Sequence, residues 1–318
     1  FETMMQLTYL TFTAPRRDDD AFASYKNRSK AELQNMDLDP SSSFSDSITS
    51  TLYSKHPRTL RIKADMVDKM NYDKILSMYQ DRFKDASDFT FILVGNVDVE
   101  AVKPLIESYL GSLPSINRKE TFKDNHIAMR KGICKNEFIR QQETPKVNNF
   151  ICYSGTCKYN LRNEILMSMT DQLLNFIYTE KVREDEGGTY GVYPMGQLIK
   201  YPTEKAVLQI FFNTAPDKQE KLIKIIYDEA EAFAKNGPDE ASLNKVKEYM
   251  LKKHSEDLKE NGYWLNSIDE YLYTGIDPVK DYEQIINSIT PKDVQQFANE
   301  LLKQKNQITV SMISPEKK

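Results

Sequence analysis

The feature that most constrains this sequence is a long internal repeat. Residues 71–96 align with residues 290–315 without a gap. The matched positions keep their apolar character: Ile75 with Val294, Met78 with Phe297, Phe83 with Leu302, Phe89 with Ile308, Phe91 with Val310 and Leu93 with Met312. Their spacing predicts that each copy contains a helix followed by a strand, which in the first copy covers residues 89–94.

The repeat extends to the start of the chain. A nearly identical offset places Met4, Met5 and Phe12 on Ile225, Ile226 and Phe233, so the same helices recur in the same order. A unit of this length is far longer than a solenoid repeat, which indicates a duplicated domain. We predict that residues 1–113 are the C-terminal portion of a first domain, that the polar residues 114–125 are a linker, and that residues 126–318 are a complete second domain.

Hydrophobic patterns predict the elements of the complete copy. The expected strands, rich in aromatic and branched residues, are 136–142, 146–153, 189–198, 205–213 and 308–314. The expected helices are 161–182, 217–235, 239–260, 263–274 and 291–303. Strands, then paired helices, then a return strand are typical of an α+β domain in which helices cover an antiparallel sheet.

Composition narrows the functional classes. The 318 residues are 40% hydrophobic and 28% charged, with a net charge of -4 and no sustained basic block, so we expect no nucleic-acid partner. No apolar run is long enough to span a membrane. The cysteines, Cys134, Cys152 and Cys157, form no CxxC pair and are expected to be ordinary small thiols. Phe1 lies inside a predicted helix, so we expect the chain to continue a longer polypeptide, which leaves the compartment open.

One stretch stands out as a candidate binding site. Arg183 falls at the C-terminal end of a predicted helix, and Tyr190 falls in a predicted strand seven residues later. Gly187 and Gly188, between them, allow a sharp reversal of the backbone. A guanidinium and a phenol held on either side of one turn could donate hydrogen bonds to a peptide carbonyl or an oxyanion. The alternative is an exposed arginine and a tyrosine that packs in a strand.

The sequence resembles the C-terminal half of the pitrilysin and insulinase-like zinc metallopeptidases, peptidase family M16. The resemblance covers nearly the whole chain and rests on residues 89–102 followed by 109–114, on residues 12–15, on residues 261–265, and above all on the Arg183 to Tyr190 stretch with its glycines. It implies duplicated M16-type (LuxS/MPP-like) domains, of which the first copy here is incomplete. It also implies two halves that close around an unfolded peptide.

The resemblance also implies where the chemistry lies. Peptide-cleaving members of the family hold zinc with an inverted His-x-x-Glu-His motif in the N-terminal half, and this motif is absent here. The three histidines, His56, His126 and His254, lie far apart, and Glu32 is expected to be a surface carboxylate, so we expect no metal site in this chain. By resemblance, Arg183 and Tyr190 reach the active site of the other half and hydrogen-bond the substrate backbone, with Gly187 and Gly188 shaping the segment.

Two hypotheses remain open at this stage. In the first, the chain is the substrate-binding half of a zinc endopeptidase that degrades or processes peptides, and it is inactive alone because the metal lies in an N-terminal half, on the same or a separate polypeptide. In the second, it is a non-catalytic peptide-binding or scaffold partner of an active subunit. Strand addition at a free sheet edge is a further way to hold a peptide. The family suggests a bacterial periplasm as the compartment.

Overall fold

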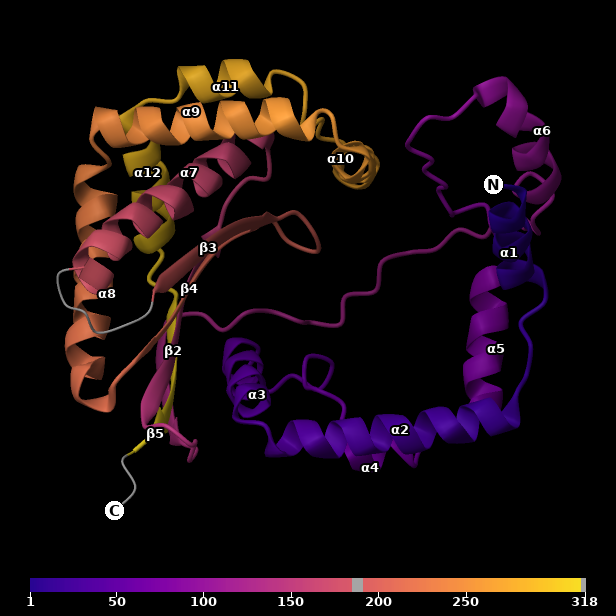
Figure 1. Cartoon of the computed structure of the whole chain (residues 1–318), viewed down its shortest axis with the longest axis horizontal. Helices are drawn as coiled ribbons and strands as arrows, with labels where there is room; N and C mark the ends of the chain where they lie inside the picture. Colours follow the sequence, from indigo (N-terminus) through magenta and orange to yellow (C-terminus); the bar gives the residue numbers. More distant parts are fainter. Residues whose placement is uncertain (185–190, 316–318) are drawn as a thin grey trace. The chain divides into compact units, whose positions relative to one another are not determined.

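A computed structural model of the chain describes residues 1–184 and 191–315 (Figure 1). Its contacts divide it into two compact units. The first unit consists of residues 1–38 and 61–125, and the second consists of residues 39–60 and 126–318. Residues 39–60 therefore pack with the second unit, although the sequence analysis grouped them with residues 1–113.

The first unit is helical in its described residues. Its helices are α1 (Glu2–Thr13), α2 (Asp19–Leu38), α4 (Ala64–Val67), α5 (Tyr72–Phe83) and α6 (Val99–Tyr109). Phe12 is buried, and its ring meets those of Phe83 and Phe89 edge to face at centroid distances of 4.9 and 4.8 Å. This aromatic cluster joins α1, α5 and the segment that follows α5.

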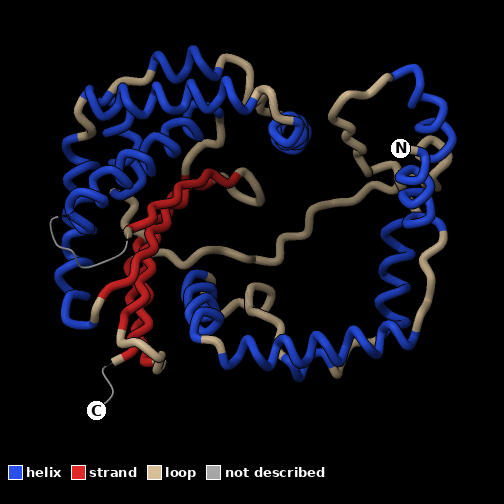
Figure 2. Tube along the Cα trace, in the orientation of Figure 1, coloured by secondary structure: helices blue, strands red, loops and turns tan. Residues whose placement is uncertain are grey.

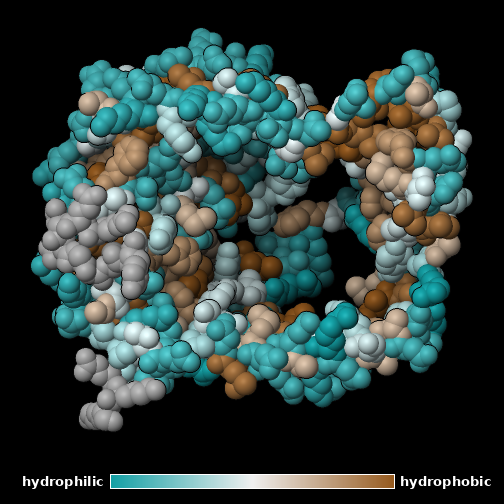
Figure 3. All heavy atoms as spheres, viewed as in Figure 1, coloured by the Kyte–Doolittle hydropathy of each residue, from teal (hydrophilic) through white to brown (hydrophobic). Residues whose placement is uncertain are grey.

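The strand expected at residues 89–94 is not present. These residues form no helix or strand, and the described part of the first unit contains no strand with which they could pair. Because a strand exists only through hydrogen bonds to a neighbour, an apolar pattern alone cannot produce one. Apolar residues reach the surface of this unit, where they appear as brown atoms in Figure 3. Among the exposed apolar side chains of the unit are Ile75, Met78, Phe91 and Leu93, which are 37–64% exposed.

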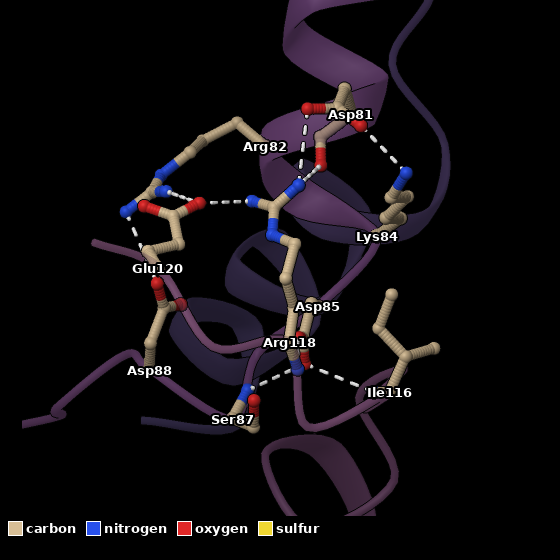
Figure 4. A network of polar contacts seen from close by, with 9 residues as sticks. All are labelled: Asp81, Arg82, Lys84, Asp85, Ser87, Asp88, Ile116, Arg118 and Glu120. Atoms are coloured by element: carbon tan, nitrogen blue, oxygen red, sulfur yellow. Dashed lines mark hydrogen bonds and ion pairs between the residues drawn. The ribbon is translucent and has the colours of Figure 1, made fainter. Parts of the chain in front are cut away.

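A buried carboxylate fixes the start of the 114–125 segment on the first unit (Figure 4). Asp85 is 1% exposed and accepts hydrogen bonds from the backbone N–H groups of Ser87, Ile116 and Arg118 at 3.1, 3.0 and 2.7 Å. Burial alone would raise the pKa of Asp85, but these hydrogen bonds hold that pKa far below its ordinary value. Around it, ion pairs link Arg118 to Asp81 and to Glu120.

The second unit is built on a mixed sheet, which in the described residues has five strands in the order β1-β5-β2-β4-β3 (Figure 2). The strands are β1 (Ile133–Ile139), β2 (Lys146–Thr156), β3 (Val192–Ile199), β4 (Lys205–Thr214) and β5 (Gln307–Ser314). All pairs are antiparallel except β1 with β5, which is parallel. The sequence analysis expected an antiparallel sheet and missed this pair. The short connection after β1 reverses the chain into β2, and β5, also antiparallel to β2, inserts between them.

Helices cover both faces of this sheet. On one face pack α7 (Leu161–Tyr178), α8 (Gln219–Asn236) and α12 (Pro291–Leu302), with α9 (Glu240–Asp257) beyond α7. On the other face lies α3 (Pro40–Leu52), which contributes Phe44, Ile48 and Leu52 to a cluster with sheet residues (Figure 1). Because both faces are covered, β2 is buried along most of its length, which includes the four consecutive apolar residues 150–153.

The repeat is visible in the helices. The offset that relates residues 71–96 to residues 290–315 carries both ends of α5 onto those of α12, and equivalent N-cap residues begin the two helices. Asn71 accepts from the N–H of Lys74, and Thr290 accepts from the N–H of Asp293. The remaining elements are α10 (Asn261–Thr274), α11 (Tyr282–Ser288), the π-helix η1 (Thr179–Glu184) and the 3₁₀ helix η2 (Pro216–Lys218). The expected α+β architecture, a sheet covered by helices, is confirmed for the second unit.

Candidate functional site beside the edge strand

The predicted Arg183 to Tyr190 site falls largely outside the described residues. Gly187, Gly188 and Tyr190 lie outside them, and for Arg183 only the backbone position, in η1, is described. The described residues that flank the segment are buried. Tyr178 and Val182 on one side are fully buried, and Val192 at the start of β3 is 3% exposed. The described residues on both sides of the segment therefore lie in the core of the second unit.

The helix before the site changes its geometry near its end. After Tyr178, the α-helix continues as the π-helical turns of η1, a rare form that is often found at functional sites. The Tyr178 hydroxyl donates a hydrogen bond to the Ile226 carbonyl of α8 at 3.3 Å, which ties this end of α7 to the neighbouring helix. The sequence analysis expected one continuous helix over residues 161–182 and did not distinguish the two forms.

Strand β3, which follows the predicted site, is one edge of the sheet. The N–H of Gly196 points away from β4 and donates to Asp171 Oδ2 on α7 at 3.0 Å. Along an antiparallel edge strand, the backbone N–H and C=O groups of every second residue point away from the neighbouring strand. The backbone groups of Pro194 and Leu198 therefore also point away from β4. Pro194 has no N–H to offer, so the free edge is blocked at two successive outward positions. A peptide could add to this edge only at its remaining positions.

Close packing between β3 and α7 requires the glycine at position 196. A Cβ atom on Gly196 would lie 2.4 Å from Met167 Sδ, which is closer than any normal contact. The absence of a side chain therefore lets the strand approach the helix closely enough for the bond to Asp171.

A polar stripe runs along α7 toward two cavities. The stripe is formed by Glu164, Ser168, Asp171, Gln172 and Asn175. A cavity of about 520 Å³ lies beside β3, lined by Asp171, Gln172, Asn175, Phe176, Pro194, Met195, Gly196 and Tyr249. A second cavity of about 490 Å³ shares Gln172 and Tyr249 with it and extends between α7, α9 and α10. The two cavities form neighbouring hollows along one side of α7.

Burial changes the acidity of both carboxyl groups on this stripe. Burial raises the pKa of Asp171 to about 6, although the hydrogen bond from Gly196 acts in the opposite direction. Burial also raises the pKa of Glu164 to about 7, against a hydrogen bond with Tyr159 and together with the nearby charge of Glu270. Near neutral pH these groups can therefore act as donors or acceptors, which suits hydrogen bonding to a polypeptide backbone.

The second cavity also holds a structural histidine. His254 is 6% exposed, stacks on Tyr282 with a ring-centroid distance of 4.3 Å, and lies 3.2 Å from the Tyr263 hydroxyl through Nδ1. Glu32, by contrast, is on the surface 3.9 Å from Arg28. In the described residues, no group of three or more His, Cys, Asp or Glu side chains is placed to hold a metal ion. The cysteines are free thiols, and Cys152 is buried in the sheet.

Sequence reasoning missed the polar stripe and its partner on β3. Ile165, Met169 and Leu173, spaced by four along the expected helix, form a buried apolar face of α7. The stripe could have been predicted from the polar residues of the same helix, because they recur at intervals of three or four on the face that the apolar residues leave free. Nothing local indicated that Asp171 meets Gly196, because the two residues are brought together by the sheet.

The fold is that of the C-terminal domains of M16 peptidases. The chain superimposes on the periplasmic protease PqqL from Escherichia coli with a TM-score of 0.83 and 18% sequence identity, covering 99% of this chain and 35% of that chain. It also superimposes on a peptidase M16 inactive domain from Pseudomonas fluorescens with a TM-score of 0.75 and 17% identity, covering 99% of this chain and 75% of that chain.

The sequence pattern of the family "Peptidase M16 inactive domain" matches residues 69–250. This is more than half of the chain, so the chain belongs to peptidase family M16. A relative named zinc protease PQQL-like, from Arabidopsis thaliana, is 24% identical over 84% of this chain and 29% of its own length. The probable zinc protease PqqL of E. coli is 21% identical over 95% of this chain and 32% of its own length. The chain thus spans about a third of these relatives.

Proposed function

We propose that this chain is the substrate-binding C-terminal half of an M16 zinc metallopeptidase that degrades or processes peptides in a closed chamber. The observation that supports the proposal is the sequence of residues 183–190 in a chain of the M16 inactive-domain family. The described elements on either side are η1, which ends at Glu184, and the edge strand β3, whose Gly196 donates a hydrogen bond to Asp171 of α7. In the proposal, Arg183 and Tyr190 hydrogen-bond the substrate backbone, and Gly187 and Gly188 shape the turn between them.

The proposed chemistry divides between two halves. Zinc, its bound water and the general base belong to an N-terminal M16 half, on the same or a separate polypeptide, and this chain contributes donors to the developing oxyanion. The curated relatives carry the name zinc protease, which supports this division. The chain alone is then inactive. Zinc-dependent peptide cleavage by the purified chain would contradict the proposal.

Substitutions at the two donors test their role. In the assembled enzyme, Arg183→Ala and Tyr190→Phe should each lower kcat/KM for a peptide substrate by about 100-fold, on the order of 3 kcal/mol in transition-state stabilisation. The melting temperature should change little. Arg28→Ala, at an exposed arginine of α2, and Tyr193→Phe, at an exposed tyrosine of β3, are matched controls that should leave kcat/KM unchanged. If both donor variants kept full kcat/KM, the assigned role would be wrong.

A second candidate function is that of a non-catalytic peptide-binding or scaffold partner of an active subunit. The matched region, residues 69–250, belongs to a family described as an inactive domain, which supports this second candidate. In that case the N-terminal half of the polypeptide to which this chain belongs would also lack the His-x-x-Glu-His motif. Zinc analysis of that whole polypeptide, purified away from any other subunit, distinguishes the two: one bound zinc supports the peptidase, and none supports the scaffold.

We also propose a bacterial periplasmic location. The supporting observation is that the similar PqqL structure from E. coli is described as a periplasmic protease. None of the helices in the described residues is apolar and long enough to cross a bilayer. Recovery of the protein in the osmotic-shock fraction of its source cell is expected, and recovery with the cytosolic fraction would contradict the location.

A further inference from the structure

Strand β1 forms the edge of the sheet opposite to β3. Gly132, just before β1, accepts a hydrogen bond from the N–H of Gln307, and Arg140, just after it, donates one to the Ile313 carbonyl. Because the backbone groups of every second residue in a strand point to the same side, the even-numbered residues of β1 bond to β5. The backbone N–H and C=O groups of the odd-numbered residues therefore point outward from the sheet. These residues are Ile133, Lys135, Glu137 and Ile139.

The edge of β1 is open, unlike the edge of β3. Strand β1 contains no proline, and no segment in the described residues pairs with it on its outward side. The side chains of Ile133 and Ile139 are 74% and 73% exposed, so both ends of the strand are accessible. In β3, by contrast, Pro194 and the bond from Gly196 to Asp171 block two outward positions. All outward positions of β1 are thus available to a further strand.

The side chains at the outward positions lie on the face of the sheet away from α3. Asn136, between them, points to the other face and donates to Ser47 Oγ of α3 at 3.0 Å. On the face away from α3, Lys135 lies 3.0 Å from Glu137, and Glu137 accepts a hydrogen bond from Gln219 of α8 at 3.3 Å. Along this face the strand therefore presents, in order, an apolar, a basic, an acidic and an apolar side chain.

This order is complementary to itself when the strand runs antiparallel to a second copy. With a two-fold axis beside Asn136, Lys135 lies opposite Glu137 of the second copy, and Ile133 lies opposite Ile139 of the second copy. These are the positions whose backbone groups point outward, so each opposed pair can exchange both of its N–H···O=C hydrogen bonds. Opposite charges and apolar side chains placed directly across from each other stabilise an antiparallel pair.

The neighbouring registers are not complementary. An axis beside Lys135 would place two lysines opposite each other, and an axis beside Glu137 would place two glutamates opposite each other. Each of these registers also places an isoleucine opposite a charged residue. Like charges directly opposite each other destabilise a strand pair, and charged side chains on an edge normally prevent pairing with an unmatched strand. The charges of β1 therefore admit one register of self-pairing and oppose the others.

We propose that β1 is a self-association edge, to which a second copy of this chain adds its own β1 in the antiparallel register centred on Asn136. The two sheets, each with the strand order β1-β5-β2-β4-β3, then continue into one another across the interface. The second copy is selected by the matched charges of Lys135 and Glu137 and by the isoleucines on either side of them. This association does not depend on the proposed peptidase function.

Analytical ultracentrifugation of the whole chain tests the proposal. The average mass should rise from that of a monomer toward that of a dimer as the protein concentration increases. Lys135→Glu and Glu137→Lys should each weaken self-association by about ten-fold or more, because like charges then face each other. An equimolar mixture of the two variants should associate again, because opposite charges then face each other at both positions. Lys224→Glu, on the exposed side of α8, is the matched control and should associate as the native chain does.

Amide hydrogen exchange locates the interface. In the native chain, exchange of the N–H groups of Lys135 and Glu137 should slow as the protein concentration rises, whereas exchange of the outward N–H of Leu198 on β3 should not change. A chain that stays monomeric at every concentration would overturn the proposal, even if an added extended peptide protected the β1 amides. Self-association that both charge variants retain, or a mixture of the variants that stays monomeric, would also overturn it.

Discussion

Asp171 shows how one partly buried carboxyl group can both hold a strand against a helix and line a cavity. Its hydrogen bond from Gly196 holds β3 against α7, and it lines the cavity beside the edge strand. Burial raises its pKa to about 6, above the value near 3.9 that an aspartate has in an unfolded chain. The folded state therefore binds this proton more tightly than the unfolded state does. The resulting stabilisation is complete below about pH 4 and is lost as the pH rises through about 6.

Substitution of this residue should remove that pH dependence. Asp171→Asn keeps an acceptor for the Gly196 N–H without a buried charge, so at pH 7.5 the free energy of unfolding of the second unit should rise by about 1–3 kcal/mol relative to the native protein. Urea unfolding between pH 4 and pH 7.5 measures it. Asp228→Asn, on the exposed side of α8, serves as the control. An unchanged pH slope in the Asp171→Asn protein would contradict the argument.

Asp85 behaves in the opposite sense. Its backbone hydrogen bonds hold its pKa below the ordinary value, so its stabilising contribution is present above about pH 4 and is lost as the pH falls through the depressed pKa. Asp85→Asn replaces one acceptor oxygen by a donor, and it should lower the melting temperature of the first unit by roughly several degrees at pH 7. The difference from the native protein should shrink in strong acid. Asp65→Asn, at an exposed site, should show neither effect.

At the scale of elements, equivalent apolar side chains of the two repeat copies differ in how far they are buried. Phe297 on α12 is 9% exposed, whereas its counterpart Met78 on α5 is 64% exposed. The same contrast holds for Val310, which is fully buried in β5, and Phe91, which is 40% exposed. Equivalent apolar patterns thus give equivalent helices, but burial depends on whether a sheet lies against them.

Truncation at the paired positions should therefore have unequal effects. Phe297→Ala should destabilise the second unit by about 3–5 kcal/mol, because it leaves a cavity between α12 and the core. Met78→Ala should change the stability of the first unit by no more than about 0.5 kcal/mol in this chain. Chemical denaturation followed by probes in each unit makes the comparison. A loss of several kcal/mol from Met78→Ala would show that α5 is covered in solution.

For the whole molecule, the chain path links the two units more than once. Residues 39–60 leave the first unit, contribute α3 to the second, and are followed by residues 61–125 of the first. The connection after residue 118 has no helix or strand before β1, and Phe122 within it is 76% exposed. This connection is the natural site for proteolysis, while α3 remains a separate attachment.

Limited trypsin digestion should therefore cut near Lys119 and Lys123 without separating the fragments. The two fragments are the parts of the chain before and after the cut. They should co-elute in native size-exclusion chromatography, because α3 in the first fragment stays packed on the sheet of the second. They should separate in urea. Leu52→Asp, which places a charge in the interface between α3 and the sheet, should allow them to separate without denaturant. If the two fragments of the unsubstituted protein separated without denaturant, the prediction that α3 holds them together would be wrong.

The sequence by itself predicted the repeat and, in the second unit, the five strands and the helices α7, α8, α9, α10 and α12 in their order, whereas α3 and α11 were not expected. The predicted features depend on local spacing, as in Asn71 and Thr290, whose side chains cap equivalent helices. It also singled out the segment from Arg183 to Tyr190, whose role stays a prediction. Only the tertiary structure decided that β1 pairs in parallel with β5, that residues 89–94 form no strand, and that Asp171 meets Gly196. Each of these depends on a partner distant in sequence, and local patterns of hydrophobicity do not specify which distant segment will supply it.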